Sequence, residues 1–154
     1  MCQWHAANVL IMKGSYDVEA QSPAACERIW ALLVDASSWP KWGTVDELMP
    51  ERSANISDDG HDGVGAVRAF RTGRVVTSER IVELEPCRLF AYVDAENPYL
   101  RDYRAEIRLS PAAAGGTSIR WHGTYEVAFG VHLFMRPLMN RTMRRMVEGL
   151  ARAA

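Results

Sequence analysis

The chain has 154 residues, of which 48% are hydrophobic and 24% are charged, and its formal net charge is −1. This length and composition are typical of one globular domain that can bury its own core. The nearly balanced charge gives no general attraction to nucleic acid or to a membrane surface. No segment reaches the roughly 18 consecutive apolar residues of a membrane span, so stable membrane insertion is not expected.

The cysteines and histidines give no sign of a metal centre. Cys2, Cys26 and Cys87 are odd in number and far apart in the sequence. This pattern argues against a disulfide framework and fits a reducing cytoplasm, with Cys26 as a buried apolar residue on a helix. Histidine pairs with metal-binding spacing, phosphate-binding glycine motifs and serine-hydrolase motifs are also missing from the sequence. We therefore expect a cytoplasmic protein with no metal and no cofactor.

The first part of the chain predicts one strand and two helices. Residues 15–20 alternate between polar and apolar, which is typical of a half-buried strand, and we assign residues 1–14 to an N-terminal extension and 15–154 to a single domain. Ser22 and Pro23 supply a helix N-cap followed by proline at the first helical position. Residues 35–42 predict a second short helix, in which Trp39 and Trp42 lie one turn apart and close one end of the core.

The middle of the chain reads as strands separated by short turns. The predicted strands are residues 45–52, 66–72, 74–84, 88–95, 103–110 and 117–129. Short connections between consecutive strands favour an antiparallel meander. The polar loop 55–62, which contains His61 and Asp62, is interpreted as a solvated surface loop, with a gate over a cavity entrance as the alternative.

The last residues, 131–154, predict one long amphipathic helix. Its apolar residues recur at steps of three and four and are rich in methionine, whereas arginines occupy the opposite side. Methionine fills irregular apolar space, so this stripe is either ordinary core or the wall of a ligand cavity. A long helix after a run of antiparallel strands predicts an α+β fold, with a curved sheet of about seven strands around the helix. The apolar stripe consists of Met135, Met139, Met143, Met146, Val147 and Leu150, and the basic side of Arg141, Arg144 and Arg145.

The order of several short motifs resembles the SRPBCC superfamily. These motifs are Ser22-Pro23, Arg28-Ile29-Trp30, Asp35 with Trp39 and Trp42, and Gly63-Val64-Gly65. The chain from about residue 15 to 151 is similar to the START/Bet v 1-like helix-grip fold, and in particular to its bacterial polyketide cyclase/dehydrase-like branch. The resemblance implies an internal cavity between a seven-stranded sheet and the C-terminal helix. This fold hosts hormone receptors, lipid carriers, cyclases and chaperone activators, so the resemblance does not select one chemistry.

Alternation along the strands predicts which residues face this cavity. Resemblance to the plant hormone receptors of the fold favours Glu79 as an inward residue, and alternation places Asp94 inward as well. Burial would raise the pKa of Glu79, so Glu79 and Tyr103 are the candidate catalytic residues, unless Glu79 pairs with an arginine or lies at the cavity mouth in water. The candidate ligand-binding residues are Phe70, Thr77, Phe90, Tyr92, Tyr103, Trp121, Met139, Met143, Met146 and Val147.

Three functions are open at this point. The first is binding of a hydrophobic or amphipathic small molecule, of the lipid, polyketide or isoprenoid type, in the internal cavity. The second is a cyclase, aromatase or dehydratase acting on a polyketide-like substrate, with Glu79 and a tyrosine as acid and base. The third is contact between an acidic protein partner and the basic helix face around Arg144 and Arg145. A monomer and a homodimer are both compatible with all three functions.

Overall fold

Seven strands form one antiparallel sheet in the computed structural model, which describes residues 9–154. The spatial order is β1-β7-β6-β5-β4-β3-β2, so β2 to β7 form a continuous meander and β1 pairs with β7. This arrangement confirms the predicted antiparallel meander. The strands are β1 (Ile11–Ser22), β2 (Glu47–Leu48), β3 (Val67–Thr72), β4 (Val75–Glu85), β5 (Leu89–Glu96), β6 (Arg101–Pro111) and β7 (Thr117–Ala128).

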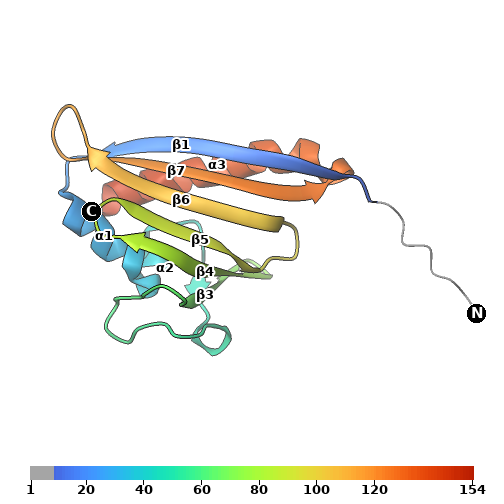
Figure 1. Ribbon diagram of the computed structural model, residues 1–154, viewed down its shortest axis with the longest axis horizontal. Helices are drawn as coiled ribbons and strands as arrows, with labels where there is room; N and C mark the ends of the chain where they lie inside the picture. The colour runs from blue at the N-terminus through green and yellow to red at the C-terminus, as the bar shows by residue number, and fades with distance from the viewer. Residues whose placement is uncertain (1–8) are drawn as a thin grey trace, which may run out of the picture.

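Helices cover one face of this sheet. Helix α1 (Cys26–Val34), a 3₁₀ turn (Ala36–Ser38) and α2 (Trp39–Trp42) lie between β1 and β2 in the chain, and a second 3₁₀ turn (Pro50–Arg52) follows β2. The long helix α3 (Phe129–Ala153) follows β7 and packs along β1 and β7 on the same face (Figure 1). The predicted α+β helix-grip fold is confirmed. Within the described residues, no helix is both long and apolar enough to cross a bilayer.

One continuous core fills the space between the sheet and the helices. The Trp39 ring lies 5.5 Å from Phe70 and 5.8 Å from Trp121, measured between ring centroids, so α2 closes one end of the core as predicted. The methionine stripe faces this core, although Met139 is only half-buried. On the opposite side of α3 the arginines are exposed, and their contact with an acidic partner stays a prediction. The buried residues of the stripe are Met135, Met143, Met146, Val147 and Leu150.

Some predicted boundaries are wrong. Ser22 ends β1 instead of capping a helix, because its Oγ accepts the Ala24 N–H at 3.2 Å and α1 begins only at Cys26. The predicted strand 45–52 is only two residues long in the structure, as β2. Pro50 has no N–H to donate to a neighbouring strand, and it starts a 3₁₀ turn. Strand β1 begins at Ile11, so residues 11–14 join the sheet, and residues 1–8 of the expected extension lie outside the described residues.

Two glycines let tyrosine rings lie flat across the β1–β7 pair. Gly14 stands opposite Tyr125, and Gly123 stands opposite Tyr16. A Cβ atom at either glycine would overlap the facing ring. Side chains larger than hydrogen are therefore excluded at positions 14 and 123, and both tyrosine side chains are buried on the inner face of the sheet.

A disulfide joins Cys26 at the start of α1 to Cys87 in the β4–β5 turn. This bond corrects the prediction that Cys26 is a free, buried apolar residue. Arg88 N–H donates to the Glu85 carbonyl at 2.9 Å, and this tight turn holds Cys87 in the left-handed region at φ 58°. The two cysteines are 61 residues apart, so no local sequence pattern reveals the pair. The cysteines therefore no longer support a reducing compartment.

Replacing Cys87 by serine is expected to lower the free energy of unfolding by about 2–4 kcal/mol, because the bond constrains a long loop of the unfolded chain. The measurement is urea unfolding under oxidising conditions. Cys26→Ser and the Cys26→Ser/Cys87→Ser double variant serve as controls and should match the single Cys87 variant, since each removes the same bond. An unfolding midpoint of the unmodified protein that does not move on adding dithiothreitol would contradict this expectation.

Candidate functional site

A fully buried arginine organises the polar part of the interior. Arg68 on β3 lies directly opposite Glu79 on β4, and its Nη2 donates a hydrogen bond to the Glu79 carboxylate. Its Nη1 donates to the Leu33 carbonyl at 2.8 Å and lies 4.0 Å from Oδ2 of buried Asp62. The guanidinium stacks 4.2 Å from the centroid of the Trp39 ring. One cation thus holds two carboxylates inside the apolar core.

Glu79 faces inward, and it also forms the arginine pair that the sequence left open as an alternative. Its side chain keeps 14% of its surface exposed, whereas the Arg68 side chain keeps none. Burial raises the pKa of the Glu79 carboxyl above its ordinary value, and the charge of Arg68 opposes that rise. Glu79 therefore holds a proton more readily than a surface glutamate does. Its side chain also remains partly accessible to solvent.

Three tyrosine hydroxyls lie beside this pair. Tyr16 and Tyr103 share a hydrogen bond, the Tyr92 and Tyr103 hydroxyl oxygens are 3.2 Å apart, and Trp121 Nε1 donates to the Tyr92 hydroxyl. Burial is the main cause that raises the pKa of all three phenols. They therefore stay protonated at neutral pH and can act as hydrogen-bond donors. Tyr16 was missed at the sequence level, because its place depends on the pairing of β1 with β7.

The polar cluster opens into a small pocket of about 40 Å³. This volume is enough for a water molecule or one polar end of a ligand. Four of the residues that the sequence singled out line it, namely Phe70, Thr77, Glu79 and Tyr103. Asp94, expected to face inward, also lines the pocket and accepts the Tyr103 N–H at 3.1 Å. Ser78 and Asn97 complete the lining.

The other candidate ligand-binding residues belong to the packed core. Phe90, Tyr92 and Trp121 are buried, with ring centroids 6.2 Å apart for Phe90 and Tyr92 and 6.5 Å apart for Tyr92 and Trp121. Their part in ligand binding stays a prediction, as it does for the residues of α3. On that helix Met139 is half-buried, and the buried members are Met143, Met146 and Val147.

The acidic loop 55–62 is anchored at its end. Asp62 is buried, and its Oδ1 accepts the Ser57 N–H at 2.7 Å. Its backbone N–H donates to the Val34 carbonyl at 2.9 Å, which ties the loop to the end of α1. The prediction of a solvated loop therefore holds for exposed His61 but not for Asp62, which lies beside Arg68. Movement of this loop as a gate stays a prediction.

Comparison with known proteins identifies the family and the fold of the chain. A family model described as polyketide cyclase/dehydrase and lipid transport matches residues 13–154. An uncharacterized protein of Mycobacterium tuberculosis is 27% identical over 135 residues, covering 82% of this chain and 75% of the relative. Norcoclaurine synthase from Thalictrum flavum has a TM-score of 0.70 and 16% identity, covering 95% of this chain and 96% of that one. The di-domain ARO/CYC StfQ from the steffimycin biosynthetic pathway has a TM-score of 0.70 and 11% identity, covering 90% of this chain and 49% of that one. At these identities the likeness to solved structures shows the fold alone.

Proposed function

The chain belongs to the family of polyketide cyclases, dehydrases and lipid transport proteins, and from that premise we propose that it binds a hydrophobic or amphipathic small molecule between the sheet and α3. The observation that carries the proposal is a polar cluster inside an apolar core, opening to a pocket at Glu79 and Tyr103. A buried ion pair is often no more stabilising than apolar residues of equal volume. The cluster therefore supports a role in recognition rather than in folding.

Such a ligand places its polar end at the pocket and its apolar part against the methionines of α3. The Tyr103 hydroxyl and the Glu79 carboxyl offer a donor and an acceptor to a carbonyl or hydroxyl group. The pocket itself holds only that polar end, so the apolar part has to displace side chains. Met139 is half-buried and Met143 lies one turn further along α3, and unbranched methionine side chains can move to admit a lipid, polyketide or isoprenoid chain.

Filling the pocket is the direct test of this binding function. Thr77 lines the pocket, whereas Arg80 is exposed on the same strand. Thr77→Trp is expected to weaken binding of the apolar fluorescent probe anilinonaphthalene sulfonate by about tenfold or more. Arg80→Trp should bind the probe as the unmodified protein does. Equal binding by all three proteins would reject the pocket, and mass spectrometry of the purified protein identifies any small molecule that it retains.

The alternative is a cyclase, aromatase or dehydratase acting on a polyketide-like substrate. The observation that favours it is the raised pKa of Glu79, which burial causes, next to protonated tyrosine hydroxyls. In this reaction the Glu79 carboxylate removes a proton next to a substrate carbonyl, and the Tyr103 hydroxyl donates a hydrogen bond to the carbonyl oxygen, where negative charge develops. Glu79→Gln separates binding from turnover, because the amide keeps the shape of the side chain but cannot accept a proton as a base.

A further inference from the structure

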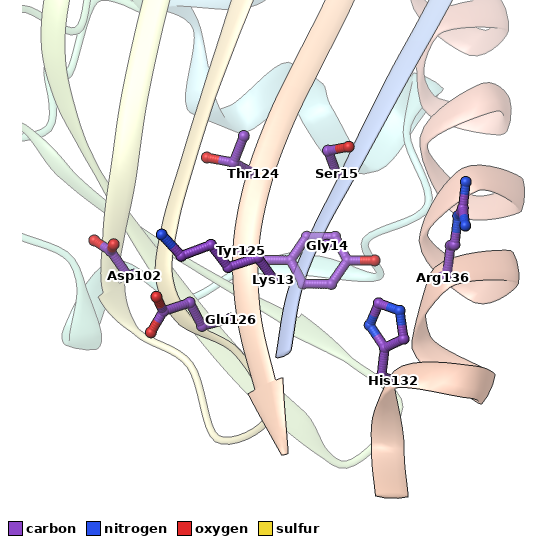
Figure 2. Close-up of a pocket in the computed structure, with 9 residues that line it drawn as sticks. All are labelled: Lys13, Gly14, Ser15, Asp102, Thr124, Tyr125, Glu126, His132 and Arg136. Carbon is purple, nitrogen blue, oxygen red and sulfur yellow. The ribbon is translucent and has the colours of Figure 1, made fainter. Parts of the chain in front are cut away.

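A second and larger pocket, of about 520 Å³, lies where β1 and β7 meet the first turns of α3 (Figure 2). Tyr125 of β7 is only 2% exposed, and its ring lies across Gly14. Its buried hydroxyl has no hydrogen-bond partner among residues 9–154, and Figure 2 shows it pointing toward His132 and Arg136. A buried hydroxyl without a partner is costly, so this phenol is aimed at a group that the pocket receives.

Two further groups that can donate hydrogen bonds converge on the same side of the pocket. His132 Nδ1 is buried and also lacks a hydrogen-bond partner within the described part of the chain. Arg136 follows one turn later on α3, and over residues 9–154 no carboxylate oxygen lies within 4.0 Å of its guanidinium. A hydroxyl, an imidazole and a guanidinium therefore face one space.

The carboxylates of this pocket belong to the other face of the sheet. Glu126 stands opposite Lys13 in the β1–β7 register, and both side chains point away from α3 (Figure 2). Asp102 lies on that side as well. No carboxylate of the pocket lies on the side that faces α3, and that side therefore carries the positive charge of Arg136.

Exposed apolar side chains flank these donors. Phe129 and Leu133 precede Arg136 by seven and three residues on α3, so the three lie along one side of the helix. Phe129 is 57% exposed and Leu133 is 76% exposed. Leu10, whose carbonyl accepts the Phe129 N–H at 2.8 Å, is exposed too. Apolar surface of this kind next to unpaired donors matches a molecule with an acidic head and a hydrocarbon chain.

We propose that this pocket binds the carboxylate of an amphiphile, with the head group at Tyr125, His132 and Arg136 and the hydrocarbon chain over Phe129 and Leu133. An arginine fork takes a carboxylate through two parallel hydrogen bonds. A single guanidinium balances one negative charge, which favours a carboxylate over the roughly doubly charged phosphate monoester. The inference goes beyond the function proposed above, because none of these residues lines the pocket at Glu79.

Titration of the full chain with octanoate tests the site. Calorimetry gives the affinity, and amide-resolved NMR shows where the ligand binds, with shifts expected at Gly14 and His132 and not at Glu79. Arg136→Gln should weaken octanoate binding by about tenfold or more, and Tyr125→Phe should weaken it by several-fold. Arg141→Gln, an exposed arginine on the same helix, is the matched control and should bind as the unmodified protein does.

Each other outcome overturns the proposal. Absence of octanoate binding, or equal binding by octanol, shows that no carboxylate is recognised. Equal loss in the Arg136 and Arg141 variants shows only a general charge effect. Tighter binding of octyl phosphate than of octanoate assigns the pocket to phosphate head groups instead. Octanoate shifts confined to the residues around Glu79 would support the function proposed above and reject this second site.

Discussion

Arg68→Met is expected to lower the free energy of unfolding by about 3–5 kcal/mol, because removing one partner of a buried ion pair leaves the other charges uncompensated. Arg68 is fully buried between Glu79 and Asp62, and Asp62 Oδ2 has no hydrogen bond among the described residues. Methionine keeps much of the side-chain volume but supplies neither charge nor donors. Urea unfolding monitored by tryptophan fluorescence measures the loss, with Trp39 stacked on the guanidinium as a local reporter.

Two controls separate charge from packing. Arg71 lies on the same strand as Arg68, but its side chain is 38% exposed and pairs with Glu47. Arg71→Met should therefore lower the free energy of unfolding far less than Arg68→Met. Combining Arg68→Met with Glu79→Gln should recover part of the loss, since the variant then buries one negative charge fewer. If Glu79→Gln lowers the free energy of unfolding by the same amount in the Arg68→Met variant as in the unmodified protein, the two residues are not coupled.

The loss in Arg68→Met should depend on pH in a defined direction. Arg68 opposes the rise in the pKa of Glu79 that burial causes, so its removal raises that pKa further in the folded state. The ordinary pKa of glutamate is 4.5. Between that pH and the higher pKa of the folded variant, the folded variant keeps a proton on Glu79 that the unfolded chain has released. Stability therefore falls as the pH rises from that value through the folded pKa. The difference from the unmodified protein should be smaller at about pH 5 than at about pH 8, and the opposite trend would contradict this account.

Glu79→Gln is expected to decide between the two proposed functions. If Glu79 transfers a proton, turnover of the compound that the purified protein retains should fall by about 10²–10⁴. The amide keeps the shape of the side chain and can still accept a hydrogen bond from Arg68, so affinity should change much less. A carrier would show a modest change in affinity and no turnover in either form. The measurement is the rate constant and the dissociation constant, determined separately on the same compound.

Glu83→Gln is the matched control for this variant, because Glu83 is exposed on the same strand. It should leave both the rate and the affinity unchanged. The rate of an enzyme that uses the Glu79 carboxylate as a base should rise with pH through a pKa above 4.5, the direction in which burial moves it. Turnover by Glu79→Gln at the rate of the unmodified protein would exclude an acid or base role for this residue.

Local patterns in the sequence determined the architecture. The spacing of Met135, Met143 and Leu150 defined the buried side of α3, and alternation on β7 placed Trp121 on the inner face. On β4 alternation only separated the two faces, and the resemblance to the plant hormone receptors of the fold favoured the one with Glu79 as the inner face. These features follow from the periods of a helix and a strand, which neighbouring residues impose on one another. The predicted fold class therefore needed no knowledge of distant contacts.

Only the tertiary structure decided which residues meet. The partner of Glu79 is set by the β3–β4 register, which puts Arg68 directly opposite. The Cys26–Cys87 bond likewise joins α1 to the distant β4–β5 turn. Pairing of β1 with β7 brings Gly14 against Tyr125, at the pocket that α3 completes with Arg136. The periodicity of the sequence along a strand or helix separates the residues of one face from those of the other. Which residue of another element a side chain contacts depends on strand order and register, and these are properties of the whole chain.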